Sequence, residues 1–309
     1  MRLRDAPSLT GCLLVASESD RPIPILPPAV ATSYGMTGAN TTDLMDLYRR
    51  HLDRRGLAAV TIDRRLAALR MLDEHAGGLL EIDVETIERF LDARHGRAGR
   101  LDPRTRTCWI SHLHTFYAWA VAFGHTAIDP TARLVRPKLR RSLPRPIPEH
   151  DYLRAVDRAP TEQLRAWLLL AGNAGLRCCE IAGLRGEDVH SGQLRVLGKG
   201  AKERVVPMHP RLEATADRWP AAGFVFVDPA TGGPYRPQQV SKHLGDFFRR
   251  ERLPYRAHQA RHRFASAVFA QTGDILVVAE LCGHESIETA RIYAAVTPER
   301  RRAAVALIS

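Results

Sequence analysis

The sequence predicts a mainly α-helical protein, with a small all-α domain followed by a mostly helical domain that contains a small antiparallel β-sheet. Three observations support this fold class. The length of 309 residues suits two domains better than one core. Apolar residues recur at helical spacing between Thr41 and Gly124, and again after Asp151. Short segments that favour strands flank a Gly-Lys-Gly turn at residues 198–200.

The composition is that of a folded, basic protein without a membrane span. Hydrophobic residues make up 45% and charged residues 26% of the chain, which excludes a wholly disordered protein. No stretch approaches the roughly 20 apolar residues that a membrane-spanning helix needs. The 45 Lys and Arg residues outnumber the 34 Asp and Glu residues, and the net charge of +11 indicates a polyanionic partner, with nucleic acid as the leading candidate.

The N-terminus and the cysteines indicate a cytoplasmic protein that begins with an arm. Residues 1–37 hold a cluster of prolines and no helical periodicity, which predicts an extended or mobile segment. Its short apolar run at 12–16 lacks the pattern of a secretion signal. The five cysteines form no Cys-x-x-Cys pair, and their odd number favours a reducing compartment.

Residues 38–130 predict a helical domain of four helices. Asp43 is expected to cap the first helix, and Gly56 to end it. Asp102 is expected to cap the fourth, with Pro103 at the first helical position. The four apolar patterns cover residues 43–56, 62–72, 83–91 and 102–124.

Residues 131–148 predict a basic, proline-rich linker. Between Asp129 and Glu149 the chain carries six cationic residues and no acidic one. Prolines keep such a segment extended, and its like charges repel unless a polyanion lies against them. A solvated linker without a partner stays an alternative. The candidate nucleic-acid contacts are Arg133, Arg136, Lys138, Arg140 and Arg141.

Residues 149–309 predict the second, mostly helical domain. Two strands at 193–197 and 204–206 form a hairpin, and a further strand is expected at 224–227. The last expected helix, at 298–307, suits either docking onto a neighbouring copy or capping its own domain. The other expected helices cover residues 151–158, 162–174, 178–184, 238–250, 258–270, 275–281 and 286–294.

Four local sequence motifs of this second domain contain candidate catalytic residues. They are Gly175-Leu176-Arg177-Cys178-Cys179-Glu180, Gly198-Lys199-Gly200-Ala201-Lys202-Glu203-Arg204, His258-Gln259-Ala260-Arg261-His262, and Gly283-His284 with Tyr293 nine residues later. Together they resemble the catalytic domain of the tyrosine recombinase (phage integrase) family. Its signature is an Arg, a Lys on a hairpin, a His-x-x-Arg pair, a His or Trp, and a Tyr nucleophile. Cys282 and Ala260 stand where the family commonly has Leu, and both changes spare the charged positions.

The motif residues also suit phosphodiester exchange on chemical grounds. Tyr293 supplies a nucleophile, which needs a nearby base such as His258 because a phenol is mostly protonated at neutral pH. Arg177 and Arg261 can each grip two phosphate oxygens. His284 is expected to donate a hydrogen bond to a nonbridging oxygen. The resemblance implies that Lys199 protonates the leaving 5′ oxygen.

Two further residues are expected to support this catalytic set. Glu180 follows Arg177 by three residues and can aim its guanidinium. His262 is expected to pack against the catalytic groups. A metal site formed by His258 and His262 is the alternative, but a zinc protease would carry Glu at position 259, so no metal is expected. Taken singly, a tyrosine such as Tyr293 is more commonly a buried core residue with a satisfied hydroxyl, and the joint pattern of motifs changes that balance.

The resemblance covers residues 150–295, and more weakly the preceding helical domain, which is similar to the family's core-binding domain. It implies a site-specific recombinase of the simple two-domain Xer type that forms a 3′-phosphotyrosyl intermediate without a cofactor. It also implies double-stranded DNA at a recombination site and a tetramer on two duplexes as partners. The target DNA, and the choice between a mobile element and DNA dimers, stay open. The alternative is a non-catalytic DNA-binding regulator on the same fold.

Overall fold

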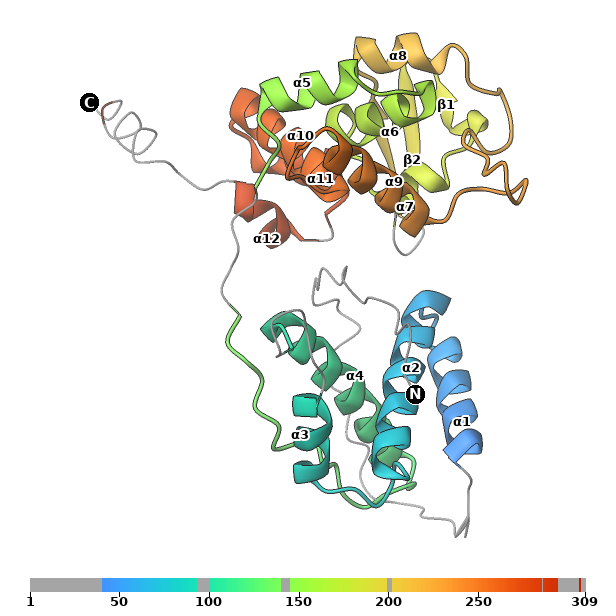
Figure 1. Ribbon diagram of the computed structural model, residues 1–309, viewed down its shortest axis with the longest axis vertical. Coiled ribbons are helices and arrows are strands. Elements are labelled where there is room, and N and C mark those ends of the chain that lie inside the picture. Colours follow the sequence, from blue (N-terminus) through green and yellow to red (C-terminus); the bar gives the residue numbers. More distant parts are fainter. Residues whose placement is uncertain are drawn as a thin grey trace. The chain divides into compact units, whose positions relative to one another are not determined.

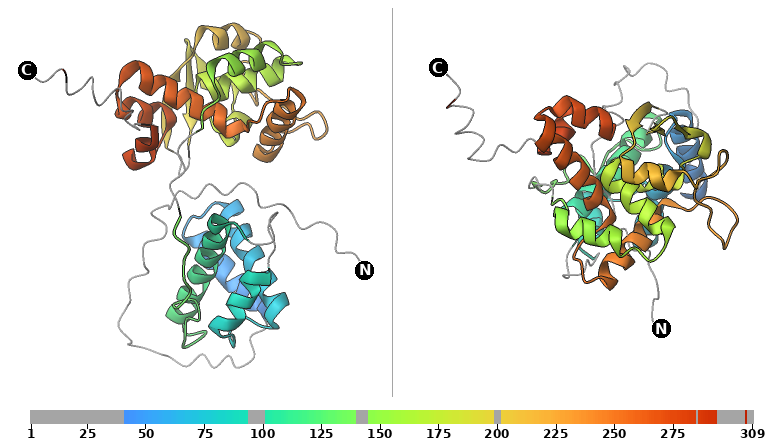
Figure 2. Two further views of the ribbon diagram at one scale, coloured as in Figure 1. Left: turned by 60° about the vertical axis from the view of Figure 1, so that its left-hand side comes forward. Right: turned by 90° about the horizontal axis from the view of Figure 1, so that it is seen from above.

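The computed structural model is mainly helical, as predicted, and describes residues 41–93, 101–139, 145–198, 202–284, 286–293 and 306. It divides into a first unit, residues 1–141, and a second unit, residues 142–309 (Figures 1 and 2). The expected arm at 1–37 lies outside the described residues, as does the expected helix at 298–307 except for Ala306. None of the described helices has the length and apolar character required to cross a membrane.

The four predicted helices form the core of the described part of the first unit. The helix α2 packs against each of the other three, and aromatic residues such as Phe90 and Phe116 fill the core between them. The hydroxyl of the buried Tyr117 donates to the carbonyl of Leu79 at 2.8 Å, which fixes the loop after α2. The helices are α1 (Thr41–Arg54), α2 (Ala59–Ala76), α3 (Val84–Ala93) and α4 (Pro103–Ala122).

The helix starts follow local capping chemistry. The carboxylate of Asp102 accepts the backbone N–H of Arg104 at 2.9 Å, and Pro103 occupies the first position of α4, as predicted. The cap predicted at Asp43 is wrong, because α1 already begins at Thr41. Asp43 instead lies in the first turn, where its charge still interacts favourably with the helix dipole.

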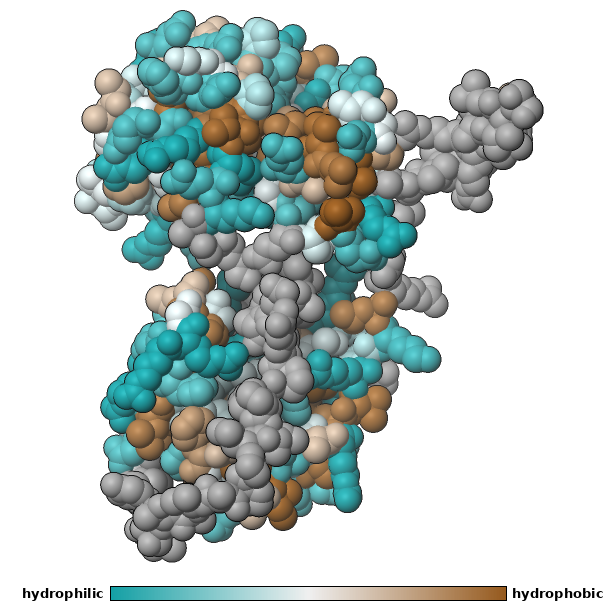
Figure 3. Space-filling view, turned by 180° about the vertical axis from the view of Figure 1, so that it is seen from behind, coloured by the Kyte–Doolittle hydropathy of each residue, from teal (hydrophilic) through white to brown (hydrophobic). Residues whose placement is uncertain are grey.

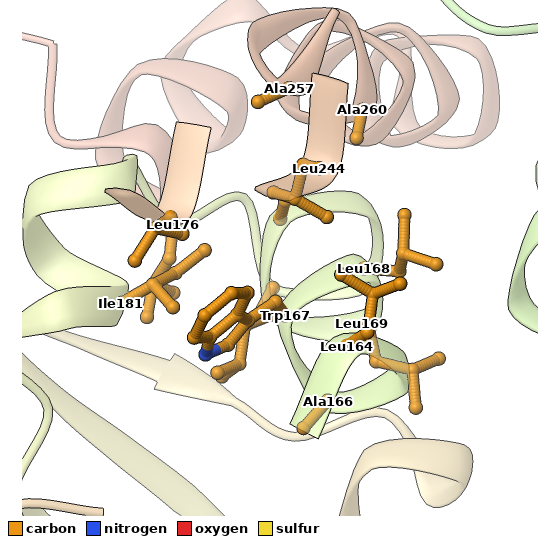
Figure 4. Packing of buried hydrophobic residues seen from close by; sticks show 14 of the residues in the cluster. Leu164, Ala166, Trp167, Leu168, Leu169, Leu176, Ile181, Leu244, Ala257 and Ala260 are labelled. Carbon is orange, nitrogen blue, oxygen red and sulfur yellow. The ribbon is translucent and has the colours of Figure 1, made fainter. Parts of the chain in front are cut away.

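The second unit is built around the buried helix α6. Trp167 lies among leucines of its own helix and residues of neighbouring elements, including Leu176, Ile181 and Leu244 (Figure 4). Helices α5, α8, α9 and α10 all pack against α6. The helices of this unit are α5 (Glu149–Asp157), α6 (Glu162–Asn173), α7 (Cys178–Ala182), α8 (Pro210–Ala216), α9 (Pro237–Arg250), α10 (Ala257–Thr272), α11 (Ile275–Cys282) and α12 (Ile287–Ala290), with 3₁₀ turns η2 (Gly186–Asp188) and η4 (Arg291–Tyr293).

An antiparallel sheet of three strands lies in the described part of the second unit. Its strands β1 (Val189–His190), β2 (Gln193–Leu197) and β3 (Glu203–Pro207) follow one another in chain order. Leu194 pairs with Val206, and both side chains are buried. The hairpin of β2 and β3 confirms the two strands predicted there.

One strand predicted for this unit is wrong, and one of its helices was not predicted. The strand expected at 224–227 does not form, because Phe224 bridges to Arg185 whereas Val227 bridges to Pro234, so its two ends pair with different segments. The helix α8 was not expected; Pro210 occupies its first turn and His209 caps it.

Polar residues cover most of the face shown in Figure 3, and hydrophobic ones gather on one side of the second unit.

The last described segment forms a small subsidiary core. Val278 and Cys282 of α11 pack on Phe264 and Ala265 of α10, together with Ala290 of α12. The single helix expected at 286–294 is instead the short α12 followed by the 3₁₀ turn η4. This packing places Tyr293, the last residue of η4, against α10.

Candidate active site

Three arginines from separate parts of the second unit meet at the end of α11. The last carbonyls of a helix lack partners within the helix and carry its negative dipole end, so they attract cationic donors. The hydrogen bonds run from Arg204 Nε to Leu281 O at 2.9 Å, from Arg261 Nη2 to Cys282 O at 2.5 Å, and from Arg177 Nη2 to Gly283 O at 3.0 Å. Three consecutive carbonyls therefore each hold a different guanidinium.

The carboxylate of Glu180 is the second anchor of these arginines. Arg204 donates to both of its oxygens at 2.9 Å, and Arg177 Nη1 donates to Oε1 at 2.8 Å. Arg261 Nη1 lies 3.7 Å from Oε2. Burial by itself raises the pKa of Glu180, but the hydrogen bonds and charge of Arg204 and the charge of Arg261 outweigh it and lower the pKa to about 2. Glu180 is therefore ionised at neutral pH.

The local fold of α7 brings Arg177 and Glu180 together. Arg177 is the residue before the helix, and its backbone N–H donates to Glu180 Oε2 at 2.7 Å. In such a capping box the side chain of the third helical residue accepts the backbone N–H of the N-cap residue. The same carboxylate thus fixes both the backbone and the guanidinium of Arg177.

The three guanidinium groups differ in their access to solvent. The side chain of Arg177 is 34% exposed, whereas those of Arg204 and Arg261 are 8% and 2% exposed. Both terminal nitrogens of Arg261 donate to backbone carbonyls, those of Gly175 and Cys282. One carboxylate faces three cations, so the cluster keeps excess positive charge. Arg177 is the most solvent-exposed of its three arginines.

Tyr293 lies against the histidines of α10. Its hydroxyl is hydrogen-bonded to His262 Nδ1 at 2.6 Å. The ring of His258, one turn earlier, meets the ring of His262 edge to face at a centroid distance of 4.4 Å. The ring of His284 stacks on that of Tyr293, with centroids 6.1 Å apart. The partner of the hydroxyl is thus His262, where the sequence suggested His258.

The histidines of this site are neutral at pH 7. Burial, aided by neighbouring charges that include Arg261, lowers the pKa of His258 to about 3, of His262 to about 4 and of His284 to about 3. Burial raises the pKa of Tyr293, and the charges of Arg261 and Arg177 oppose that shift only in part. A neutral phenol therefore faces neutral imidazoles when no anion is bound.

We expect that His258, His262 and His284 do not titrate between pH 7 and pH 5. The unfolded chain takes up protons near pH 6.5 whereas the folded site does not, so each histidine lowers stability as the pH falls below 6.5. Histidine ¹⁵N NMR of the full chain measures each midpoint, with single His→Gln variants for assignment. A midpoint above pH 5.5 at any of the three contradicts this prediction.

Gly283 is the contact point of two of the arginines. Its φ of +58° lies in the left-handed region, and a Cβ there would stand 2.9 Å from Arg204 Nη1 and 3.0 Å from Arg204 Cδ. We expect Gly283→Ala to lower the free energy of unfolding by about 1–2 kcal/mol and to displace Arg204. Gly232→Ala is the control, because Gly232 has a φ of +68° but open space around it.

Urea unfolding of the two glycine variants measures this effect. The backbone strain is common to both, so the difference between them isolates the contact with Arg204. Equal losses of stability in Gly283→Ala and Gly232→Ala would show that Arg204 gives way without cost.

The remaining candidate residues fall into two groups. The side chains of Arg133, Arg136 and Lys138 are exposed in the stretch that follows the helices of the first unit. Lys199, Arg140 and Arg141 lie outside the described residues. Within the described ranges, no group of three or more His, Cys, Asp or Glu side chains is arranged to hold a metal ion.

Arg204 belongs to the site although no role was predicted for it from the sequence. A signal for it exists in β3, where alternate residues share one face. Val206 is buried, so Arg204, two residues earlier, points toward the same side. A cation directed inward requires an acidic partner, and the buried acids in the described part of this unit are Glu180 and Asp228. The pairing itself spans 24 residues and depends on the tertiary fold.

Comparison with known proteins identifies relatives of this chain. A family model described as the phage integrase family matches residues 145–300. The tyrosine recombinase XerC of Xylella fastidiosa (strain 9a5c) is 34% identical over 258 residues, which are 77% of this chain and 87% of that protein. XerC of Xanthomonas campestris pv. campestris (strain B100) is 31% identical over 300 residues, 88% and 92% of the two chains.

Solved structures show the same fold. A lambda integrase (residues 75–356) dimer bound to a COC′ core site has a TM-score of 0.68 at 18% identity, covering 82% of this chain and 94% of that one. XerH recombinase bound to its difH substrate in a pre-cleavage complex has a TM-score of 0.62 at 18% identity, covering 87% and 85%. This chain belongs to the phage integrase family and is a tyrosine-type site-specific recombinase, an enzyme that cleaves and rejoins DNA.

Proposed function

We propose that this recombinase cleaves each DNA strand with Tyr293 and forms a 3′-phosphotyrosyl intermediate. The observation that carries the proposal is the hydrogen bond of Tyr293 to His262 next to the three-arginine cluster. Arg261 and Arg177 are close enough to Tyr293 for their charges to act on its pKa. A phenol near such cations has its phenolate stabilised when it attacks a phosphate.

In the chemical step one bond forms, one bond breaks and two protons are transferred. Tyr293 Oη bonds to phosphorus, and the bond from phosphorus to the 5′ oxygen breaks. The phenol proton passes to His262 Nδ1, the imidazole nitrogen within hydrogen-bond distance of it. The leaving 5′ oxygen takes a proton from Lys199, a role that rests on the family resemblance. The phosphotyrosyl bond conserves the energy of the broken ester, so rejoining by the reverse step needs no ATP.

The other side chains of the site stabilise the charge that develops on the nonbridging oxygens. We assign Arg177 as the main contact because its guanidinium is the exposed one, and Arg261 as its buried companion. His284 Nδ1 is buried and has no hydrogen-bond partner within the described part of the chain. A phosphate oxygen would give it one. His258 supports the ring of His262 through their edge-to-face contact.

The proposed partners are double-stranded DNA and further copies of this chain. Lambda integrase has been solved as a dimer bound to a COC′ core site and as a tetramer bound to a Holliday junction. We extend this to a tetramer of this chain on two duplexes, in the bacterial cytoplasm where such DNA lies. Arg133, Arg136, Lys138, Arg140 and Arg141 are proposed to contact DNA phosphates, a role that their positive charge supports. The outcome is integration or excision of a mobile element, or resolution of DNA dimers.

A nicked suicide duplex tests this proposal. The binding site is first selected from a pool of random duplexes, and its nicked form is then mixed with the protein in EDTA without ATP. We expect a covalent protein–DNA adduct on a denaturing gel, with the label retained only when it is on the strand whose 3′ phosphate is captured. Selective DNA binding without an adduct at any nick position favours a non-catalytic regulator and contradicts the proposal.

A further inference from the structure

Arg204 has contacts unlike those of the other two arginines. All three of its guanidinium nitrogens are engaged, Nε on Leu281 O and both Nη atoms on the carboxylate of Glu180. Its side chain is only 8% exposed, and three of its five N–H groups are already bonded to Leu281 and Glu180. The observed contacts of Arg204 are therefore all with other groups of the site.

The contacts of Arg204 fix the two acceptors that hold Arg177. Arg177 rests on Glu180 Oε1 and on Gly283 O. Arg204 grips Glu180 through a bidentate pair, which sets the plane of the carboxylate. It also ties the last turn of α11 to β3 at Leu281, two residues before Gly283. Loss of Arg204 would free both supports of Arg177 at once.

Arg204 also governs how much charge Arg177 offers to an anion. With Arg204 present, the negative charge of Glu180 is shared with a buried cation at 2.9 Å. Without it, Glu180 would neutralise Arg177, its other close partner at 2.8 Å. A guanidinium paired in this way attracts a phosphate less, because the field of the carboxylate opposes the field of the cation.

We infer that Arg204 is a positioning residue that holds Arg177 in place and keeps its positive charge available to the scissile phosphate. The inference rests on the proposed function, in which Arg177 contacts that phosphate. It predicts a defect in cleavage that depends on the charge of the phosphate and that disappears when Arg177 is absent.

The variants are Arg204→Gln, which removes the charge, and Arg204→Lys, which keeps the charge but loses the bidentate pair. The matched control is Arg195→Gln on the adjacent strand β2. Arg195 is 54% exposed and pairs with Asp188 at 2.8 Å. The assay is single-turnover cleavage of the suicide duplex, with the duplex Kd and the thermal midpoint measured in parallel. A second duplex carries a methylphosphonate, which has no negative charge, at the scissile position.

We expect Arg204→Gln to slow cleavage of the normal phosphate about 10- to 100-fold, with the duplex Kd changed less than about threefold. Arg204→Lys is expected to be slowed less, and Arg195→Gln to cleave at the wild-type rate. On the methylphosphonate the defect of Arg204→Gln shrinks, because a neutral phosphoryl group gains little from Arg177. In an Arg177→Gln background, adding Arg204→Gln causes no further loss.

Each other outcome has a distinct meaning. A wild-type chain that forms no adduct overturns the proposed function and this inference with it. A wild-type chain that cleaves while Arg204→Gln cleaves equally fast overturns the inference alone. Equal defects on both duplexes, or additive losses with Arg177→Gln, show a purely structural role. If Arg204→Gln does not fold, the same comparisons are made with Arg204→Lys. A cleavage defect of Arg204→Lys that is equally large on the normal and on the methylphosphonate duplex then overturns the inference.

Discussion

Tyr293→Phe is expected to abolish the covalent adduct while leaving the second unit folded. The substitution removes the nucleophilic oxygen, and loss of a covalent nucleophile lowers the rate of an enzyme by a factor of at least about 10⁴. The phenylalanine ring keeps the stacking on His284. The hydroxyl contributes one hydrogen bond, to His262, so the cost in stability is about 1 kcal/mol.

The matched control for this variant is Tyr255→Phe. The hydroxyl of Tyr255 also makes one hydrogen bond, to Asp151 at 2.6 Å, but it takes no part in the arginine cluster. Both variants lose a comparable contact, and only Tyr293→Phe loses the adduct. Adduct yield on the suicide duplex and the thermal midpoint are measured side by side. An adduct that persists in Tyr293→Phe places the nucleophile on another residue.

Local signals were sufficient to predict most helices and the β2–β3 hairpin. Asp102 followed by Pro103 predicts a helix start through capping chemistry that involves adjacent residues only. The strand expected at 224–227 failed because strand formation requires a continuous partner, and its ends bridge to Arg185 and Pro234 instead. The error therefore arose from pairing, which local sequence does not specify.

The candidate site shows the same division between local and distant information. His258 and His262 lie one turn apart on α10, so their spacing cannot decide which of them meets Tyr293. That choice is made by the packing of α11 and η4 on α10. The role of Arg204 likewise depends on contacts 24 and 77 residues away along the chain. The motifs predicted which residues gather, and the fold determines which of them touch.

Glu180→Gln is expected to destabilise the second unit by about 3 kcal/mol at pH 7, because the variant leaves three clustered arginines without their carboxylate. The magnitude follows from the fall of the pKa of Glu180 from 4.5 to about 2, at about 1.4 kcal/mol per pH unit. Glu203→Gln is the control, since Glu203 is 57% exposed and its ion pair with Arg195, at 3.6 Å, contributes little.

The pH dependence of this difference tests its electrostatic origin. A carboxyl whose pKa is lowered by folding stabilises the protein above its unfolded pKa of 4.5, and that contribution is lost as the pH falls toward its folded pKa of about 2. The gap between wild type and Glu180→Gln should therefore be full at pH 7 and shrink to about 1 kcal/mol at pH 3. Urea unfolding followed by pulse-labelling hydrogen exchange, read on peptides from α6 and α10, reports this unit alone. A gap that stays constant from pH 7 to pH 3 would mean that Glu180 stabilises the arginine cluster by its shape and not by its charge.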